Sequence, residues 1–263
     1  MRAPNGSPPQ EKCGLEKSYL DMKFYTGMFH PHTADKVDRA FVSVNVLKKR
    51  KSAFPVKDWI MDSGAFTTIN KYGGYPEPVS EYAKQIKRWK GNGNLIAAVS
   101  QDYMCEAWML EKTGLTVEEH QRLTIERYDQ LILEDTGVYI MPVLQGYDPQ
   151  DYVRHLELYG DRLADGAYVG VGSVCKRNGN PSTIVEVLRA IRAVRPDLRL
   201  HGFGVKTTAL AWADVRDNLY SADSMAWSFA ARMEGRDGND WRNAVKFQDR
   251  INSQPVQLSL CLI

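Results

Sequence analysis

Short apolar runs rich in β-branched and aromatic residues alternate with longer amphipathic segments along almost the whole chain. The runs that predict strands are residues 21–27, 40–46, 58–62, 95–101, 138–144, 167–171, 199–204 and 219–227. Helical periodicity occurs near residues 78–90, 116–135, 149–159, 181–194 and 206–216. This alternation is typical of a parallel α/β sheet, and eight strands in a chain of 263 residues match a TIM (β/α)8 barrel. A doubly wound open sheet is the alternative.

The predicted helices differ in how strongly the residues specify them. Residues 116–135 carry the clearest signal, because Thr116 is a suitable N-cap and Glu119 stands three residues later as its capping-box partner. Residues 28–57 carry the weakest, and only a short helix around "ADKVDRA" fits there. We therefore expect a barrel whose early part is less regular than its later part.

The domain organisation predicted from the chain is simple. One barrel domain is expected over residues 19–252, after a flexible segment at 1–18 and before a tail at 253–263. The composition, 43% hydrophobic and 25% charged, is that of a soluble globular protein. No apolar run reaches the roughly 18 residues that a membrane span needs, and no signal peptide is evident, which predicts a cytoplasmic protein without membrane contact.

The cysteines do not indicate a metal site or a disulfide framework. Cys13, Cys105, Cys175 and Cys261 are far apart and form no C-x-x-C pair. We therefore predict neither a metal nor another cofactor, and we expect idle or buried thiols.

Polar residues gather where the predicted strands end. In a barrel of this class, functional residues lie at the carboxyl ends of the strands. The residues found there are Asp62 after the third strand, Asp102 after the fourth, Gln145 and Gly146 after the fifth, Gly170, Val171 and Gly172 at the end of the sixth, and Asp223 within the eighth. Three carboxylates, an amide and a pair of glycines are thus predicted on one rim.

Basic residues follow several of the same strands. These clusters are Lys48, Lys49, Arg50 and Lys51 after the second strand, Lys176 and Arg177 after the sixth, and Arg232 and Arg236 after the eighth. They are either solvated surface or a phosphate-binding footprint. A pocket floored by carboxylates and ringed by positive charge indicates a nucleotide or nucleic-acid substrate.

At these residues the chain resembles the tRNA-guanine transglycosylases, which are TIM-barrel enzymes that exchange a purine base for a 7-deazaguanine. "MDSGAF" resembles their D-S-G-G-F, and "VSQDYMCE" resembles their base-binding D-E-C segment. The other similar segments are "VLQG" to V-Q-G, "YVGVGSV" to G-G-L-x-V-G, "GFGV" to M-G-V-G and "SADSMAWSFAAR" to G-x-D-x-F-D-x-x-x-P-T-R. The similarity runs from about residue 58 to residue 236.

The resemblance implies roles for these residues in base exchange at a nucleotide's C1′. Asp223 would be the nucleophile, and Asp62 would shuttle the proton of the departing and incoming bases, with Asp62 as the fallback nucleophile. Asp102 would accept paired hydrogen bonds from a guanine-like edge, helped by Gln145 and the backbone of 170–172. The remaining predicted substrate contacts are Ser63, Gly64, Gly146, a stacking Phe66 or Tyr103, and Trp227 as a pocket wall.

The chain also departs from this family. It is shorter and has no residues for the Cys/His zinc site of the bacterial and archaeal members. These differences favour the branch that inserts 7-deazaguanine bases into DNA, the deazapurine DNA-modification transglycosylases of phages and modification gene clusters. In the alignment, the family's attacking aspartate falls on Ala226. On a regular strand, residues 223 and 226 face opposite sides, so Asp223 replaces it only if the register shifts.

Several alternatives stay open at this point. The inserted base is expected to be the queuosine-related 7-cyano-7-deazaguanine type, and DNA is favoured over tRNA as the acceptor. A tRNA-specific enzyme, a non-catalytic nucleic-acid-binding subunit and a TIM-barrel hydrolase of nucleosides or sugars are the other hypotheses. A homodimer or accessory proteins are expected as partners, besides nucleic acid and the free base.

Overall fold

A single parallel sheet of nine strands forms the centre of the molecule. The computed structural model describes residues 22–174, 180–255 and 257. The strands are β1 (Lys23–Gly27), β2 (Arg39–Ser43), β3 (Asp58–Asp62), β4 (Asn94–Val99), β5 (Ile140–Met141), β6 (Val143–Leu144), β7 (Tyr168–Val171), β8 (Arg199–Gly202) and β9 (Ser221–Ser224). Their order in the sheet is β5-β4-β3-β2-β1-β9-β8-β7-β6.

The sheet closes on itself at Pro142. Strands β5 and β6 stand at opposite ends of the strand order, yet only Pro142 separates them along the chain. Proline has no N–H to give to a strand ladder, so one predicted strand is divided into two pieces. The first piece pairs with β4 and the second with β7. The result is a barrel whose fifth strand is interrupted.

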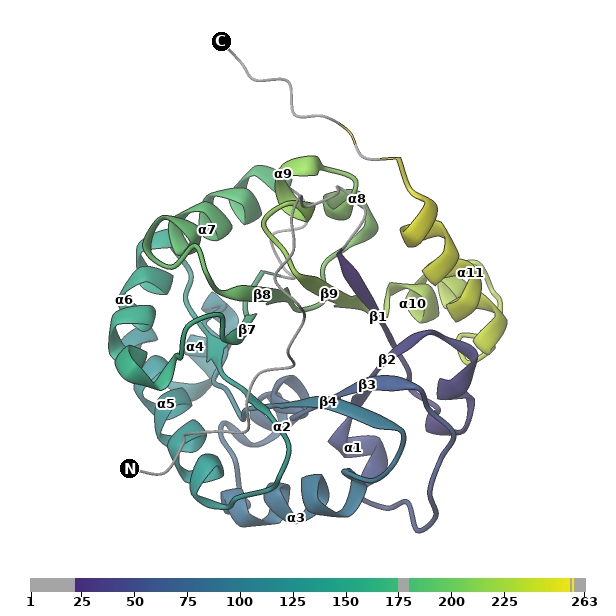
Figure 1. Cartoon of the computed structure of the whole chain (residues 1–263), viewed down its shortest axis with the longest axis horizontal. Coiled ribbons are helices and arrows are strands. Elements are labelled where there is room, and N and C mark those ends of the chain that lie inside the picture. The colour runs from purple at the N-terminus through teal and green to yellow at the C-terminus, as the bar shows by residue number, and fades with distance from the viewer. Residues whose placement is uncertain (1–21, 175–179, 256, 258–263) are drawn as a thin grey trace.

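Helices surround the barrel on its outside (Figure 1). They are η1 (Pro31–Lys36), α1 (Val44–Leu47), α2 (Ala65–Tyr72), α3 (Val79–Trp89), α4 (Ala107–Thr113), α5 (Val117–Leu133), α6 (Pro149–Tyr159), η2 (Gly160–Arg162), α7 (Pro181–Val194), α8 (Thr207–Leu210), α9 (Ala213–Arg216), α10 (Ala226–Met233) and α11 (Trp241–Ser253). Because their apolar residues recur at three- and four-residue spacing, each long helix can bury one face against the strands.

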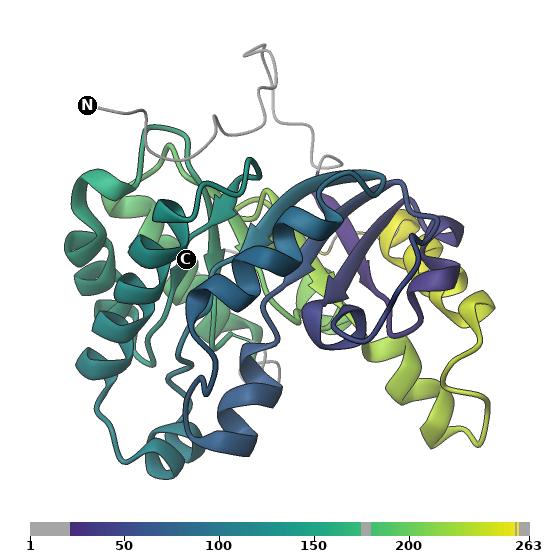
Figure 2. The same cartoon turned by 90° about the horizontal axis from the view of Figure 1, so that it is seen from below.

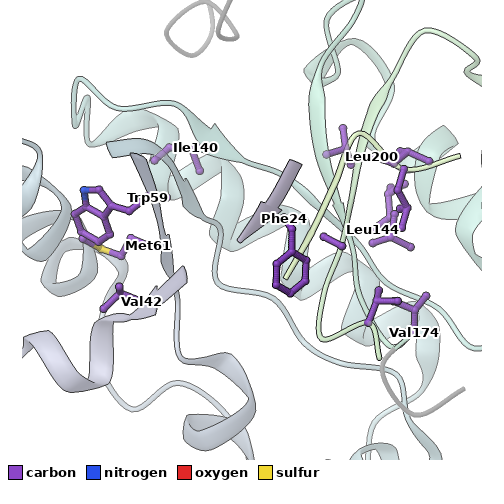
Figure 3. Close-up of a cluster of buried hydrophobic side chains, with 14 of the residues drawn as sticks. Phe24, Val42, Trp59, Met61, Ile140, Leu144, Val174 and Leu200 are labelled. Atoms are coloured by element: carbon purple, nitrogen blue, oxygen red, sulfur yellow. The ribbon is translucent and has the colours of Figure 1, made fainter. Parts of the chain in front are cut away.

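The strands bury both of their faces. Outward-facing side chains pack against the helices, as Val42, Trp59 and Met61 do in Figure 3. Inward-facing side chains form a second cluster that fills the lumen, made of Tyr25, Ile60, Ala97, Val99, Tyr139, Met141, Val143 and Tyr168 with Phe41, Ile96, Phe203 and Tyr220 beside them. Successive residues alternate between these two layers. This alternation decides which polar residues reach the lumen.

The structure confirms the predicted α/β barrel and excludes the open sheet. All eight predicted strands are present, but the strand predicted over 40–46 ends at Ser43, and its last three residues belong to α1. The capping box at Thr116 and Glu119 forms with both of its hydrogen bonds. The predicted helix over 206–216 is instead two short helices, α8 and α9. The short helix expected around "ADKVDRA" lies slightly earlier, as η1.

The predicted strand over 219–227 is wrong at its end. Strand β9 stops at Ser224, and the backbone of Met225 turns the chain so that Ala226 begins α10. Five of the eight residues of α10 are Ala, Arg or Met, which favour a helix once the chain has turned. Ala226 therefore does not alternate with Asp223 on one strand, and the register objection to Asp223 no longer applies.

The predicted ends of the domain are only partly visible. The segment 1–18 lies outside the described residues, as does most of the tail 253–263. Within the tail, Gln257 pairs with Trp212 in an isolated bridge. Across the described ranges, no helix combines the length and the apolar character needed to cross a membrane.

Candidate active site

Asp62 stands at the end of β3 and faces the lumen. It follows Ile60, a lumen residue, by two positions, and alternation places both side chains on the same face. Its Oδ2 accepts a hydrogen bond from the N–H of Gly64, 3.2 Å away, which makes a local turn. Gly64 has φ of 72° and is the N-cap of α2, and a Cβ there would lie 2.3 Å from Asn45. Asp62 thus shapes the strand–helix turn and also reaches the barrel mouth.

Asp223 faces the same lumen from β9. It pairs in register with Tyr25 of β1, whose ring belongs to the lumen cluster. Its Oδ1 accepts a hydrogen bond from the N–H of Gly204 at 3.0 Å and lies 3.3 Å from Nε2 of His201. The side chain is only 9% exposed. The carboxylate of Asp223 therefore contacts Gly204 and His201 and does not point into the helix layer.

Asp102 and Gln145 are joined directly. The side-chain amide of Gln145 donates a hydrogen bond to Asp102 Oδ2, and Ser173 Oγ lies 2.8 Å from Gln145 Oε1. Ser173 Oγ also accepts the backbone N–H of Cys105 at 3.0 Å and lies 3.1 Å from Oε2 of Glu106. All of these side chains are buried. The ends of β4, β6 and β7 are thus tied together by one polar network.

The carboxylates influence one another. Burial raises the pKa of Asp62 to about 6, the hydrogen bond from Ser43 opposes this, and the negative charge of Asp223 adds to it. Burial also raises the pKa of Asp102 to about 7, the bond from Gln145 opposes this, and the charge of Asp62 adds to it. Side chains with such pKa values can hold or release a proton near neutral pH.

The glycines at the ends of β6 and β7 make room for side chains. A Cβ on Gly172 would lie 2.1 Å from Nε2 of Gln145, and a Cβ on Gly170 would lie 2.4 Å from the ring of Phe203. A Cβ on Gly146 would lie 2.6 Å from that of Asp151. These positions accept only glycine without movement of a neighbour. Glycine is therefore needed at 170 and 172 mainly to leave room for the side chains of Phe203 and Gln145.

The candidate residues brought together here lie within one family match. The sequence matches the family described as "DpdA: DeoxyPurine in DNA protein A" over residues 20–248. The chain belongs to the DpdA family. Membership supports a DNA deazapurine-modification transglycosylase, and it confirms the resemblance to the deazapurine branch of the superfamily. Among curated proteins, no match to the chain is found.

Backbone groups of this DpdA-family protein near the glycines are engaged in the sheet. Gly170 N–H donates to Pro142 O at 2.8 Å, and Gly172 N–H donates to Leu144 O at 2.9 Å. The carbonyl of Gly172 accepts from the hydroxyl of Tyr152 at 2.7 Å. The side chain of Val171 packs in the outer core. Few backbone groups of residues 170–172 are therefore left to form the predicted hydrogen bonds with a base.

The predicted aromatic contacts fall into three environments. Tyr103 is buried between Tyr75 and His120, with ring centroids 5.4 and 5.5 Å away. Phe66 is 47% exposed on α2, next to Trp108 of α4. Trp227 is buried in the outer core and donates from Nε1 to Gly27 O at 2.9 Å. Its position is that of a core anchor between α10 and β1, which argues against the predicted pocket wall.

The predicted phosphate contacts are only partly described. Arg232 and Arg236 are exposed near the end of α10, and Nε of Arg236 donates to Glu234 at 2.8 Å. Lys176 and Arg177 lie outside the described residues. Arg232 and Arg236 follow β9, at the barrel end that carries Asp62 and Asp223.

A cavity of about 220 Å³ opens beside this end of the barrel. Ser63, Gln101, Thr67 and Lys71 are among its lining residues. Arg127 holds the side chain of Gln101 through two hydrogen bonds of 3.0 and 2.6 Å. The cavity adjoins the turn after Asp62, and its lining does not include the three aspartates.

Four functional candidates were missed in the sequence. Ser43 bonds to Asp62, Ser173 and Glu106 complete the Gln145 network, and His201 contacts Asp223. A usable signal existed for two of them, because Ser173 directly follows "GVG" and Glu106 lies within "QDYMCE". His201 looked like an ordinary strand residue, since its polar neighbours are distant in the sequence.

Proposed function

We propose that this DpdA-family protein replaces guanine in DNA with a 7-deazaguanine base of the 7-cyano-7-deazaguanine type. The observation that supports the proposal is the convergence of Asp62, Asp102 and Asp223, from three strands, at one end of the lumen. The negative charge of Asp223 helps to raise the pKa of Asp62, and that of Asp62 helps to raise the pKa of Asp102. This is a pentosyl transfer, and the family supports its coarser description as a DNA transglycosylase.

The proposed chemistry is two displacements at C1′. The Asp223 carboxylate forms a bond to C1′ while the bond from C1′ to the guanine nitrogen breaks, through an oxocarbenium-like transition state. The departing base takes the electron pair and receives a proton from Asp62. The incoming base then returns a proton to Asp62 as its nitrogen attacks C1′ and releases Asp223. The raised pKa of Asp62, about 6, suits a group that gives and then takes a proton.

Asp102 and Gln145 are the proposed base readers. An ionised Asp102 accepts hydrogen bonds from the N1–H and the exocyclic amine of a guanine-like base. Gln145 already bonds to Asp102, so the amide sets the direction of the carboxylate before a base arrives. Both side chains are buried, which strengthens hydrogen bonds made there compared with water.

The DNA would contact the two helices that follow the catalytic aspartates. Figure 2 shows α2, in blue, and α10, in lime green, projecting from the same end of the barrel. Met225 at the N-cap of α10 and two residues on the helix, Phe229 and Met233, recur every four residues and are 37%, 62% and 71% exposed. Apolar side chains of this kind insert between base steps in proteins that distort DNA. They would support the stack from which the target nucleotide leaves, while Arg232 contacts phosphate.

The test is an exchange assay with labelled 7-cyano-7-deazaguanine on duplex DNA and on tRNA. The proposal expects label in DNA, loss of exchange in Asp223→Asn and much slower exchange in Asp62→Asn. An adduct with DNA should form only where Asp223 is retained. Full activity of Asp223→Asn would overturn the assignment of the nucleophile.

Other outcomes of the same assay would support the alternatives. Incorporation into tRNA alone favours a tRNA enzyme. Binding without incorporation favours a non-catalytic subunit, for which Ala226 is the relevant departure from the wider superfamily. Release of base without exchange favours a hydrolase.

A further inference from the structure

His201 is a buried polar side chain among the aromatic rings of the lumen. It is fully buried on β8 and stacks on Phe41, with ring centroids 5.6 Å apart and planes 14° from parallel. The rings of Phe203, Tyr25 and Tyr168 surround it at 4.8 to 6.1 Å. A polar ring in such surroundings costs free energy unless its nitrogens are partnered.

One ring nitrogen has two hydroxyl neighbours. Nδ1 of His201 lies 2.8 Å from Ser221 Oγ and 3.3 Å from the hydroxyl of Tyr168, and the two hydroxyls lie 2.5 Å apart. These three groups form a closed chain inside the barrel. Their hydroxyl hydrogens can be arranged so that Tyr168 donates to Ser221 and Ser221 donates to Nδ1.

The other ring nitrogen faces the proposed nucleophile. Nε2 is buried and makes no well-aligned hydrogen bond with any described residue, and Asp223 Oδ1 lies 3.3 Å away. A lone pair on Nε2 would repel an ionised carboxylate. Nε2 therefore carries the hydrogen of the ring, and Nδ1 accepts a hydrogen bond from Ser221. Catalytic contacts are often long in a free enzyme and shorten when substrate binds.

We infer that His201 is the positioning residue of Asp223. With Gly204 N–H at 3.0 Å, it holds Oδ1, so that Oδ2 is the oxygen presented to C1′. Ser221 and Tyr168 keep the hydrogen of His201 on Nε2. This inference rests on the proposed function and adds the group that orients the nucleophile, just as partners of catalytic groups elsewhere fix their geometry.

The closing experiment compares two replacements of similar size. His201→Gln keeps an N–H donor near the position of Nε2, and His201→Met does not. We expect kcat of His201→Met to fall about 10- to 100-fold with little change in KM, and we expect His201→Gln to recover most of that loss. Trapped DNA adduct should form slowly in the methionine variant and at a nearly normal rate in the glutamine variant.

A second pair tests the hydroxyl chain. Tyr168→Phe removes the hydroxyl beside His201. Tyr139→Phe removes a lumen hydroxyl that bonds instead to the backbone of Tyr168, donating to its O at 3.0 Å and accepting from its N–H at 3.1 Å. Only Tyr168→Phe should lower kcat. Equal kcat in His201→Gln and His201→Met, with both folded by circular dichroism, would show that the ring is only packing and would overturn the inference.

A spectroscopic measurement separates this inference from the proposed function. In protein labelled with ¹⁵N-histidine, the His201 signal should show hydrogen on Nε2, and Ser221→Ala should change it. A ring with hydrogen on Nδ1 alone would contradict the inference even if exchange occurs. Absence of exchange in the wild-type protein would refute the proposed function and leave the Nε2 result standing.

Discussion

The side-chain amide of Gln145 donates a hydrogen bond to the carboxylate of Asp102, 43 positions earlier in the chain. This bond connects the segment that follows β4 with the segment that follows β6, the second piece of the interrupted strand. It also forms without a bound base, so the reader of the base is organised in advance. Such preorganisation lowers the cost of ordering side chains when a ligand binds.

Asp102→Asn should stabilise the protein at alkaline pH. The pKa of Asp102 is about 7 in the folded protein and 3.8 as the ordinary value, so folding favours the protonated form. Stability from this group is therefore full below pH 3.8 and is lost as pH rises towards 7, by a few kcal/mol (roughly 1.4 per pKa unit). Asparagine carries no charge at any of these pH values, so the variant does not lose this stability.

Urea unfolding at pH 4 and pH 8 checks this expectation. The variant should match the wild type at pH 4 and exceed it at pH 8. Asp165→Asn, on the surface, is the control and should show neither effect. A variant that is less stable than the wild type at pH 8 would contradict the expected role of burial.

Asp62→Asn should remove one limb of the pH–rate profile. The pKa of Asp62 is about 6, so kcat/KM of the wild type should change near that pH. Loss of a general acid–base group lowers the rate by about 10²- to 10⁴-fold. Asp58→Asn is the matched control, because Asp58 begins the same strand that Asp62 ends. A limb near pH 6 that survives in Asp62→Asn would assign it to another group.

Gly172→Ala should displace the base reader. The added Cβ would lie 2.1 Å from Gln145 Nε2, so Gln145 must leave its bond to Asp102. We expect a higher KM for the free base and a loss of about 1–3 kcal/mol in stability, measured by exchange kinetics and thermal unfolding. Gly91→Ala, where nothing lies within 4 Å of the new Cβ, should leave both unchanged. Wild-type KM in Gly172→Ala would show that Gln145 does not read the base.

Phe229→Ala and Met233→Ala should affect duplex DNA more than DNA that is already open. Unstacking a nucleotide costs a few kcal/mol. If Phe229 or Met233 offsets about 1.4 kcal/mol of this cost, its removal lowers kcat/KM about tenfold. A substrate whose target guanine stands in an unpaired bubble should be exchanged normally. Leu133→Ala is the control, because Leu133 is 84% exposed at the end of α5. Equal losses on both substrates, or a changed oligomeric state, would assign this face another role.

The barrel could be predicted from the sequence because it depends on local patterns. Alternating hydrophobicity marks strands such as 58–62, and the rule that parallel strands end on one rim then brings Asp62, Asp102 and Asp223 together. The start of α10 at Ala226 could not be predicted in this way. The run before it reads equally well as a continued strand, and the turn at Met225 depends on packing against the rest of the barrel.

The partners of the aspartates were also hidden in the sequence. His201, Ser221 and Tyr168 come from three strands and meet only because β7, β8 and β9 are neighbours in register. Ser173 adopts a positive φ of 54°, which no local signal indicates. Such contacts follow from long-range packing, so periodicity and motif spacing do not reveal them.

The interruption at Pro142 gives the barrel a seam. Two-residue strands on either side of it carry the closure, and backbone amides there should exchange with solvent sooner than those in β3 or β9. Gln145 follows the second of these strands directly. Local opening of the seam would therefore move the Gln145 amide that orients Asp102. A bound base that holds this amide in place would keep the seam closed, which would couple recognition of the base to closure of the barrel.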